Sequence, residues 1–522
     1  MNTTPPARPV PAHARQLAWL CVIACLITGS LQEIMSLSDT VYWLNLLVMS
    51  AVAVYALLRC IFTPVTVTLW DYFASMIGMM YGLGTLNTEI SGIQSFRDLA
   101  MLTTAPPLYI HETLGCVALL MSALLLIGQF SRHKLLDGLT PDWLDPFGIL
   151  VFGTLTAGVC VVLVATGTIG YHGNLLSDES ITPSPAATYA IFCSTPAAAG
   201  LVYMWRRYTQ QAKLVAGLSL LVFLAVNLYL GRRNVTYNMI VCAMAYFGAI
   251  RNQFIFTRQT IIAMVSAAAL VPIVTTGFMA MRMASYETPA GQKPTVGKIV
   301  VAAIDIIQQD KSEVNKQSAE NLKDRTYLIG YLSELAWRTE VYKPLYGDLF
   351  LYNVAMSIPN AIWPSKFSYV RTGSEEALSH PLLGMATWDA ANSVLTTGMT
   401  DFGPVGMVLY PLGIGALYAW LLTLIRKLDT SIFLLMSFSF LQCLANIESQ
   451  MLGYFTFLRD VILVSLILFA IVRTARFFRQ YNEAPSLVVK SRPNDRQSPL
   501  PGLSTMVSRA SSYIRTRRRA RA

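Results

Sequence analysis

Long apolar runs with almost no charged residues recur along this chain, and each is close to the length of a membrane-spanning helix. Hydrophobic residues make up 54% of the 522 positions, and charged residues only 13%. A soluble domain usually carries about 25% charged residues. A helix of about 20 apolar residues satisfies its own backbone hydrogen bonds inside a bilayer. The sequence therefore predicts an all-α, polytopic integral membrane protein.

The apolar runs divide the chain into four parts. Residues 1–281 are expected to hold about nine spans, and residues 402–478 about three more, which makes about twelve in total. Between them lies a large polar loop, 282–401, and residues 479–522 form a basic tail that we expect to be disordered. The predicted spans are 16–36, 41–62, 66–86, 109–130, 147–170, 186–205, 214–230, 235–250, 260–281, 402–425, 431–448 and 459–477.

The lysines and arginines in the short connections predict the orientation, because cytoplasmic loops carry an excess of them. With the N-terminus inside, the inner connections hold twelve Lys/Arg. The outer short connections hold four, namely Arg97, Arg232, Arg233 and Arg459. This split places both termini in the cytoplasm and residues 282–401 outside. The tail carries many arginines, and we favour a position near anionic lipid over nucleic-acid binding.

The loop 282–401 is long and polar, but it also contains periodic apolar positions. It carries 11 Lys/Arg and 13 Asp/Glu, and it has no cysteine, so no disulfide framework holds it. The spacing of apolar residues predicts a short helix over 295–310 and a longer one over 319–343. Prolines and glycines between 359 and 373 indicate irregular chain. We therefore expect a partly helical loop.

Two groups of arginines are candidates for binding an anion. Arg232 and Arg233 lie between two apolar runs on the predicted outer side, where arginine is disfavoured. A phosphate ligand would explain them, since a guanidinium makes bidentate contacts with phosphate. The alternatives are that they reach lipid headgroups, or that the local topology differs. Arg325 and Arg338 both lie on the predicted helix over 319–343 and are candidates for the same anion site, although a solvated face with salt bridges to Glu334 and Glu340 is equally compatible.

Several side chains in the loop can accept a proton. We single out Glu334, His380 and Asp389 as candidate catalytic residues, with further candidates at Glu340, Asp348 and the pair His111 and Glu112. A lone histidine such as His380 is more often an ordinary surface residue. The sequence contains no DxD, Walker A, GxSxG or HExxH motif, so we predict neither a metal site nor a cofactor.

Two segments near the end of the loop resemble a known family. Residues 357–366 read Ser-Ile-Pro-Asn-Ala-Ile-Trp-Pro-Ser-Lys, and residues 396–407 read Thr-Thr-Gly-Met-Thr-Asp-Phe-Gly-Pro-Val-Gly-Met. They resemble the Pro-Arg-x-x-Trp-Pro-x-Lys-Pro-like segment and the Phe-Gly-x-x-Gly helix entry of bacterial Wzy-type O-antigen and exopolysaccharide polymerases. Asn360 stands where that family usually has arginine, and Phe367 where it often has proline.

The resemblance implies a metal-independent glycosyl transfer similar to the GT-C class, at the periplasmic face of a bacterial inner membrane. The implied substrates are oligosaccharide repeat units linked to undecaprenyl pyrophosphate, and the implied partners are membrane lipids, a chain-length regulator and a flippase, with no nucleic acid. Arg232, Arg233, Arg325 and Arg338 would then stabilise the pyrophosphate leaving group. Trp337, Trp363 and Trp388 would stack on sugars, although loop packing is the more common role of such residues.

Two other functions remain open from the sequence. An O-antigen ligase, which transfers glycan to the lipid A core, has the same plan of many spans and one large loop. A lipid-linked oligosaccharide flippase would also suit twelve spans. Transporters, however, usually have short loops and two similar halves. Here the long loop follows the predicted ninth span.

Overall fold

The computed structural model of the protein describes fifteen stretches or single positions of the chain: 12–35, 38–90, 105–131, 134–136, 146–169, 184–230, 232–250, 276–284, 296–309, 312, 314, 328–360, 362–368, 375–385 and 392–483. Every regular element in these stretches is a helix. The chain forms two compact units, Met1–Ile467 and Leu468–Ala522. The candidate functional residues that the structure describes all belong to the first unit.

Eight of the described helices are long and apolar enough to cross a membrane. This confirms the all-α membrane fold and places this chain among membrane proteins. Two shorter apolar helices, α9 (Arg232–Ile250) and α17 (Thr430–Ala445), coincide with further predicted spans. The eight are α1 (Ala12–Ile34), α2 (Asp39–Phe62), α5 (Pro107–Phe130), α6 (Pro146–Ala165), α7 (Pro185–Met204), α8 (Gln210–Leu230), α16 (Val394–Leu428) and α18 (Met451–Glu483).

The predicted span 66–86 is a composite helix. It consists of α3 (Leu69–Ile77), a π-helical turn η1 (Gly78–Leu83) and α4 (Gly84–Ile90). Asp71 has a structural role at the start of this composite helix. Its Oδ2 accepts hydrogen bonds from the backbone and hydroxyl of Thr68, in a capping box that starts α3. Most of the predicted span 260–281 lies outside the described residues, so the total of about twelve stays a prediction.

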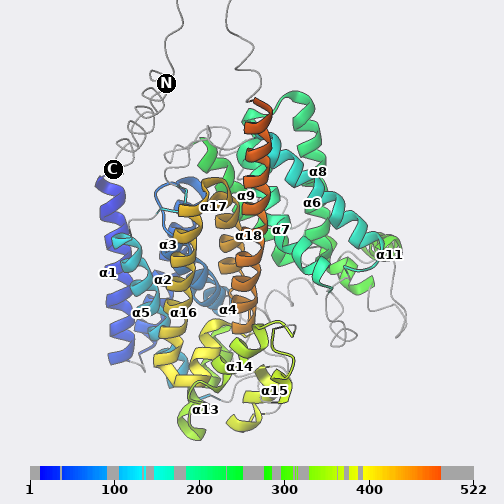
Figure 1. The fold of residues 1–522 in the computed structure, drawn as a ribbon. Helices are drawn as coiled ribbons and strands as arrows, with labels where there is room; N and C mark the ends of the chain where they lie inside the picture. The colour runs from blue at the N-terminus through cyan, green and yellow to red at the C-terminus, as the bar shows by residue number, and fades with distance from the viewer. Residues whose placement is uncertain are drawn as a thin grey trace, which may run out of the picture. The chain divides into compact units, whose positions relative to one another are not determined.

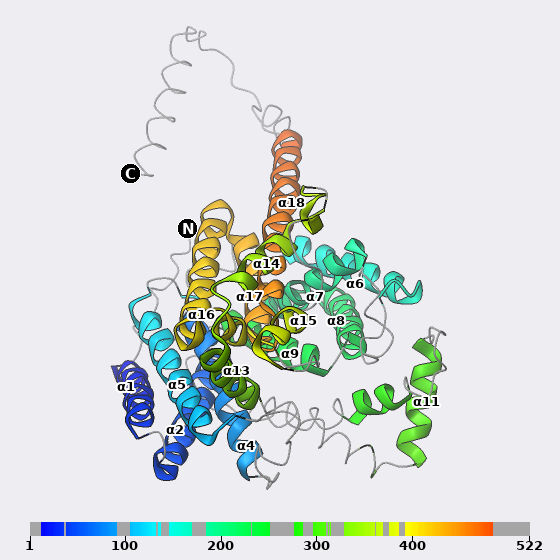
Figure 2. The same ribbon diagram turned by 90° about the horizontal axis from the view of Figure 1, so that it is seen from below.

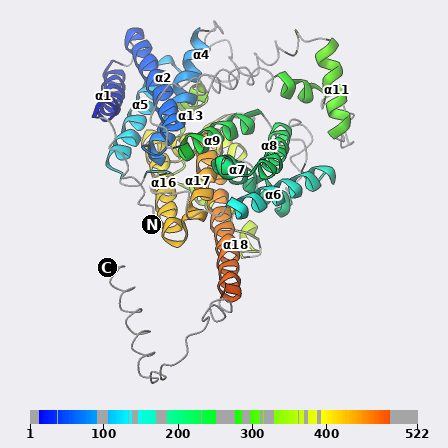
Figure 3. The same cartoon turned by 90° about the horizontal axis from the view of Figure 1, so that it is seen from above.

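The membrane helices form two groups that are joined by central helices. Figures 2 and 3 show α1, α2 and α5 on one side and α6, α7 and α8 on the other, with α9, α16 and α17 between them. The contacts agree with this arrangement: α1 packs along α5, α6 packs on α7 and α8, and α17 packs on α7 and α16. Large buried aromatic side chains such as Tyr72, Phe73 and Tyr418 fill the interior.

Three short helices of the predicted loop pack together at the end of the first unit where α16 begins (Figure 1). They are α13 (Leu328–Tyr342), α14 (Asp348–Ser357) and α15 (Glu375–Ser379). We call the described residues between 328 and 401 the cap. The predicted helix over 295–310 is confirmed as α11 (Val296–Gln309), and α13 confirms the C-terminal part of the one predicted over 319–343. The cap contacts the membrane helices directly, since α13 packs on α16 and α5.

The long helix α16 bends sharply where the cap meets the membrane region. Phe402 and Gly403 have non-helical backbone angles, and Gly403 has φ +63°, a region that side chains disfavour. The bend brings Gly398 and Gly406 so close that a Cβ on Gly398 would lie 2.3 Å from the carbonyl oxygen of Gly406. Only glycine fits at this crossing of two backbone segments.

We expect Gly398→Ala to destabilise the protein by about 1–3 kcal/mol or more, because the obstructing atom belongs to the backbone and cannot rotate away. Gly413→Ala on the same helix is the matched control, since nothing lies within 4 Å of its Cβ position. Thermal unfolding of the purified variants in detergent measures both effects. Equal melting temperatures for the two variants would show that the bend tolerates a side chain.

Candidate functional site

The cap holds a set of buried charged and polar side chains. Ionised side chains are rarely fully buried without partners. Here the buried groups come from α13, α14, α15, the first turns of α16 and the chain on either side of α15, so the site is built by several separate segments of the cap. The buried charged and ionisable members are Glu334, Lys366, Glu375, Glu376, His380 and Asp401.

Glu334 and Arg338 form an ion pair on α13. Nε of Arg338 donates to Oε1 of Glu334 over 2.8 Å, and the two side chains, in the order Arg338 and Glu334, are 17% and 4% exposed. Nη1 of Arg338 donates to the carbonyl of Gly384 over 3.3 Å. The guanidinium carbon also lies 4.5 Å from the ring centroid of Trp337, a cation–π contact. Arg338 therefore connects α13 to the chain after α15.

His380 is fully buried, so its interpretation as an ordinary surface residue is wrong. Its Nε2 lies 2.9 Å from the phenol oxygen of Tyr331, and the two groups share a hydrogen bond. Burial, together with the nearby charges of Glu376 and Glu375, raises the pKa of Tyr331 well above its ordinary value. The phenol thus stays protonated and holds the imidazole in place. The histidine is buried because α15 leads it into the interface with α13.

Glu375 joins three helices. Its Oε1 accepts from Nδ2 of Asn353 on α14 over 2.8 Å, and its Oε2 accepts from the hydroxyl of Thr397 on α16 over 2.9 Å. Burial raises the pKa of Glu375 to about 7, although the two hydrogen bonds favour the carboxylate. At neutral pH this group can therefore both hold and release a proton.

Glu376 is the neighbouring carboxylate, and one of its oxygens has no partner. Nδ2 of Asn392 donates to Oε1, at a short distance. Oε2 is buried and has no hydrogen-bond partner among the described residues, and the same holds for Oδ1 of Asn353. Leaving a buried polar atom unsatisfied costs about 1–3 kcal/mol, more when it is charged. Two unsatisfied acceptors near one pair of acids suit a site that receives hydrogen-bond donors from a bound molecule.

Asp401 fixes the cap onto α16. Its two carboxylate oxygens accept hydrogen bonds from the backbone N–H groups of Leu349 and Phe350, over 3.0 and 2.9 Å, and from the hydroxyl of Tyr410 over 2.8 Å. The negative charge thereby lies at the N-terminus of α14, where the helix dipole favours it. The Thr-Asp-Phe-Gly segment, noted in the sequence for its resemblance, is thus a docking point for the cap.

The cap is also tied to the π-helical turn in the membrane region. The hydroxyl of Tyr81 on η1 lies 2.7 Å from Oγ of Ser393, which caps the N-terminus of α16. Elsewhere in the cap, the hydroxyl of Tyr109 on α5 donates to Oε2 of Glu340 over 2.5 Å. Irregular π turns often occur at functional sites. These bonds hold the cap at one end of the membrane helices.

The structure brings together part of the predicted site. Glu334, Trp337, Arg338 and His380 share the layer where α13 meets the chain around α15. Trp363 lies elsewhere in the cap, in the connection between α14 and α15. The backbone of Arg232 and Arg233 begins α9, but their side chains are outside the described residues, and so are the whole residues Arg325, Trp388 and Asp389. Within the described stretches, no group of three or more His, Cys, Asp or Glu can hold a metal ion.

Sequence reasoning missed the acids and amides that hold the cap together. Glu375, Asn353, Asn392, Thr397 and Asp401 were not predicted as site residues. Glu375 and Glu376 lie in a polar stretch that gives no periodic signal, and their partners are 16 to 22 residues away. The one available signal was the polarity of residues 396–401, which precede an apolar run. Comparison with known proteins gives no matching family model, no matching curated protein and no matching solved structure.

Proposed function

We propose that this protein is a Wzy-type polymerase, which joins oligosaccharide repeat units carried on undecaprenyl pyrophosphate into a surface polysaccharide. The observation that supports the proposal is the cap, a set of buried acid, histidine and arginine groups at the end of a helical membrane bundle. A lipid-linked glycan presents its sugars and pyrophosphate at such a position. The sequence resemblance at residues 357–366 and 396–407 gives the reaction class.

In this proposal the acceptor hydroxyl attacks the anomeric carbon of the donor sugar. A new glycosidic bond forms, the bond from the anomeric carbon to the phosphate oxygen breaks, and the electron pair leaves with the pyrophosphate. His380 takes the proton of the hydroxyl, since Tyr331 orients its ring. Arg338 stabilises the charge on the leaving group. Oε1 of Glu334 already accepts a hydrogen bond from Arg338, so Glu334 positions that arginine.

The sequence assignments that fall on undescribed side chains belong to the same proposal. Arg232, Arg233 and Arg325 would add positive charge for the pyrophosphate, Asp389 is a further proton acceptor, and Trp388 joins Trp337 and Trp363 as a sugar contact. Glu375 adds a proton acceptor, and Oε2 of Glu376 adds an unsatisfied hydrogen-bond acceptor, neither of which the sequence suggested. The reaction itself requires no metal ion, because guanidinium groups can stabilise the leaving group.

Deletion of the gene, followed by analysis of surface polysaccharide, tests the proposal. A polymerase mutant exports single repeat units and makes no polymer. Polymer that accumulates but fails to reach the lipid A core indicates the ligase alternative. Repeat units trapped on the inner face indicate a flippase. If the deletion strain and the same strain complemented with the gene carry the same surface polysaccharide, all three functions are refuted.

The orientation that this function needs follows from the twelve-to-four distribution of Lys/Arg over the short connections. We expect a periplasmic reporter signal from a fusion at Gln317 and a cytoplasmic signal from a fusion after Arg479. Fusions at both positions to an enzyme that is active only in the periplasm, and parallel fusions to a reporter that gives a signal only in the cytoplasm, measure the sidedness. A cytoplasmic signal at Gln317 would put the cap on the wrong side for lipid-linked repeat units and overturn the proposal.

A further inference from the structure

A second pair of positive charges lies at the edge of the cap, away from the predicted site. Nζ of Lys366 donates to the carbonyls of Met356 and Ile358, over 3.1 and 2.6 Å. Nη1 of Arg459 on α18 donates to the carbonyl between them, that of Ser357, over 3.1 Å. Two cations thus share three consecutive carbonyls at the C-terminus of α14. Capping a helix end accounts for one cation, since the dipole there is negative.

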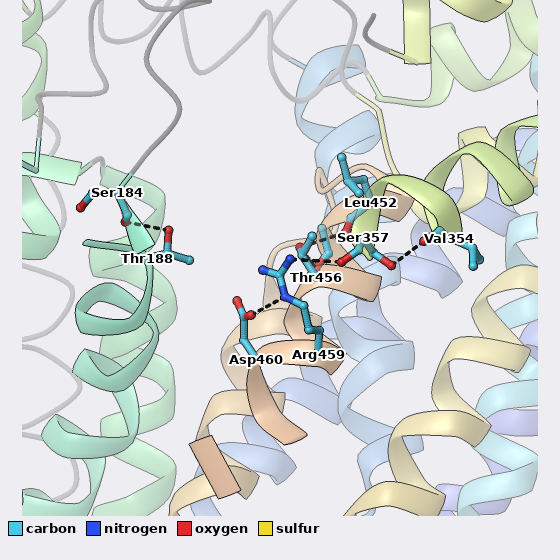
Figure 4. Close-up of polar contacts among 9 residues, drawn as sticks. Ser184, Thr188, Val354, Ser357, Leu452, Thr456, Arg459 and Asp460 are labelled. Atoms are coloured by element: carbon cyan, nitrogen blue, oxygen red, sulfur yellow. Dashed lines mark hydrogen bonds and ion pairs between the residues drawn. The ribbon is translucent and has the colours of Figure 1, made fainter. Parts of the chain in front are cut away.

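Arg459 has donors left over after these contacts. Its Nε donates to Oδ1 of Asp460 over 2.8 Å (Figure 4). The side chains of Arg459 and Asp460 are 34% and 6% exposed. An arginine carries five N–H donors, and these two bonds use one on Nε and one on Nη1. Among the described residues, the Nη2 group of Arg459 has no hydrogen-bond partner. Asp460 neutralises one positive charge of the cluster, and Lys366 is close enough to Arg459 for the two cations to repel each other.

The same face of α18 continues as an exposed apolar stripe. Residues three, four, seven and eight positions after Arg459 lie on one side of a helix. All four are large, apolar and more than 40% exposed: Ile462, Leu463, Leu466 and Ile467. Seven residues of helix span about 10 Å. This stripe is suited to contact with a hydrocarbon chain.

The guanidinium lies at the level where the cap meets the membrane helices. Side chains tilt toward the N-terminus of their helix, and that of Arg459 reaches back from the second or third turn of α18 to the carbonyl of Ser357. The cap side of the cluster is also apolar at its surface, because Leu351 and Ile362 are exposed. A lipid whose hydrocarbon chain followed this stripe would present its headgroup to such a cation.

We infer that Arg459, assisted by Lys366, binds the phosphate group of a membrane lipid whose hydrocarbon chain lies along the Ile462–Ile467 stripe of α18. Phosphate oxygens accept from the unpaired Nη2 donors in the geometry that guanidinium favours. Two lipids carry this chemistry, a polyprenyl diphosphate and an anionic phospholipid. The first source rests on the proposed function, because it would be the carrier of the repeat units, whereas the second does not.

Binding to full-length protein in nanodiscs tests the inference without any transfer assay. The probes are undecaprenyl diphosphate in neutral phosphatidylcholine discs, and phosphatidylglycerol titrated into the same discs. We expect Arg459→Gln to weaken binding of at least one probe by roughly 10- to 100-fold, as expected when hydrogen bonds to a charged group are lost. Arg426→Gln is the matched control, a half-buried arginine near the C-terminus of α16.

Arg459→Gln also leaves the buried Asp460 without its partner, so the double variant Arg459→Gln/Asp460→Asn separates folding from binding. It removes both charges of the pair. We expect this double variant to unfold at the wild-type temperature, and we expect its binding of the lipid probes to remain weakened. Loss of binding of undecaprenyl diphosphate alone identifies the carrier lipid as the ligand. Loss of binding of both probes identifies a general site for phosphate headgroups. Wild-type affinity of the folded double variant for both probes overturns the inference, whatever the deletion strain shows about polymer.

Discussion

Arg338→Ala is expected to cost about 3 kcal/mol of stability and most of the proposed transfer activity, because it removes the ion-pair partner of the buried carboxylate of Glu334. This is the lower end of the range for a broken buried pair, since Arg338 itself keeps 17% of its side chain exposed. Loss of one donor to the leaving group would also slow the reaction by roughly 100- to 1000-fold. Thermal unfolding and polymer synthesis from lipid-linked repeat units measure the two effects.

The double variant Glu334→Gln/Arg338→Ala separates structure from chemistry. It removes both charges of the pair, so we expect most of the lost stability to return. If activity stays low in this folded protein, at least one of the pair takes part in the reaction, and Glu334→Gln and Arg338→Lys assign the role. Wild-type activity in the double variant would mean that neither residue is catalytic and that the pair only holds α13 against Gly384.

The sequence predicts the membrane helices well and the cap less well, for one physical reason. A spanning helix is specified by local composition, because lipid demands apolar side chains and internal backbone hydrogen bonds. The predicted spans 41–62 and 109–130 therefore match α2 and α5 within two residues at each end. The span predicted to start at 402 belongs to a helix that begins at Val394. Its first turns are polar, and they are buried against α13 and α14.

The partly predicted site shows the same limit. The pair Glu334 and Arg338 is four residues apart on one helix, so its salt bridge could be foreseen, but the alternative of a solvated face does not hold at Glu334, which is buried. The burial of His380 depends on Tyr331, which is 49 residues away. Contacts of that kind carry no periodic signal. Single-sequence reasoning therefore finds which residues can react, and it misses which of them the fold brings together.

The raised pKa of Glu375 makes the stability of the cap depend on pH. Its ordinary pKa is 4.5, and burial raises it to about 7 in the folded protein, so the folded state holds the proton more tightly than the unfolded state. The contribution of Glu375 to stability is therefore largest below the pKa of the unfolded state, 4.5, and it falls as the pH rises from there to about 7. Because protonation and folding are linked, this one group lowers the free energy of unfolding by about 2 kcal/mol between about pH 5.5 and about pH 8.

We expect Glu375→Gln to remove that loss, so that the variant gains stability relative to wild type as the pH rises. The side-chain oxygen of a glutamine can still accept the hydrogen bond from Asn353, and its N–H can donate to the hydroxyl of Thr397. That hydroxyl also lies 3.1 Å from the carbonyl of Ser393, so it can donate its own hydrogen to this carbonyl. Melting temperatures of the purified proteins across this pH range measure the difference. Glu340→Gln, at an exposed carboxylate on α13, is the control and should follow the wild-type curve. If Glu375→Gln also follows the wild-type curve, the carboxyl does not titrate in this interval, and it cannot act as a proton store for the reaction.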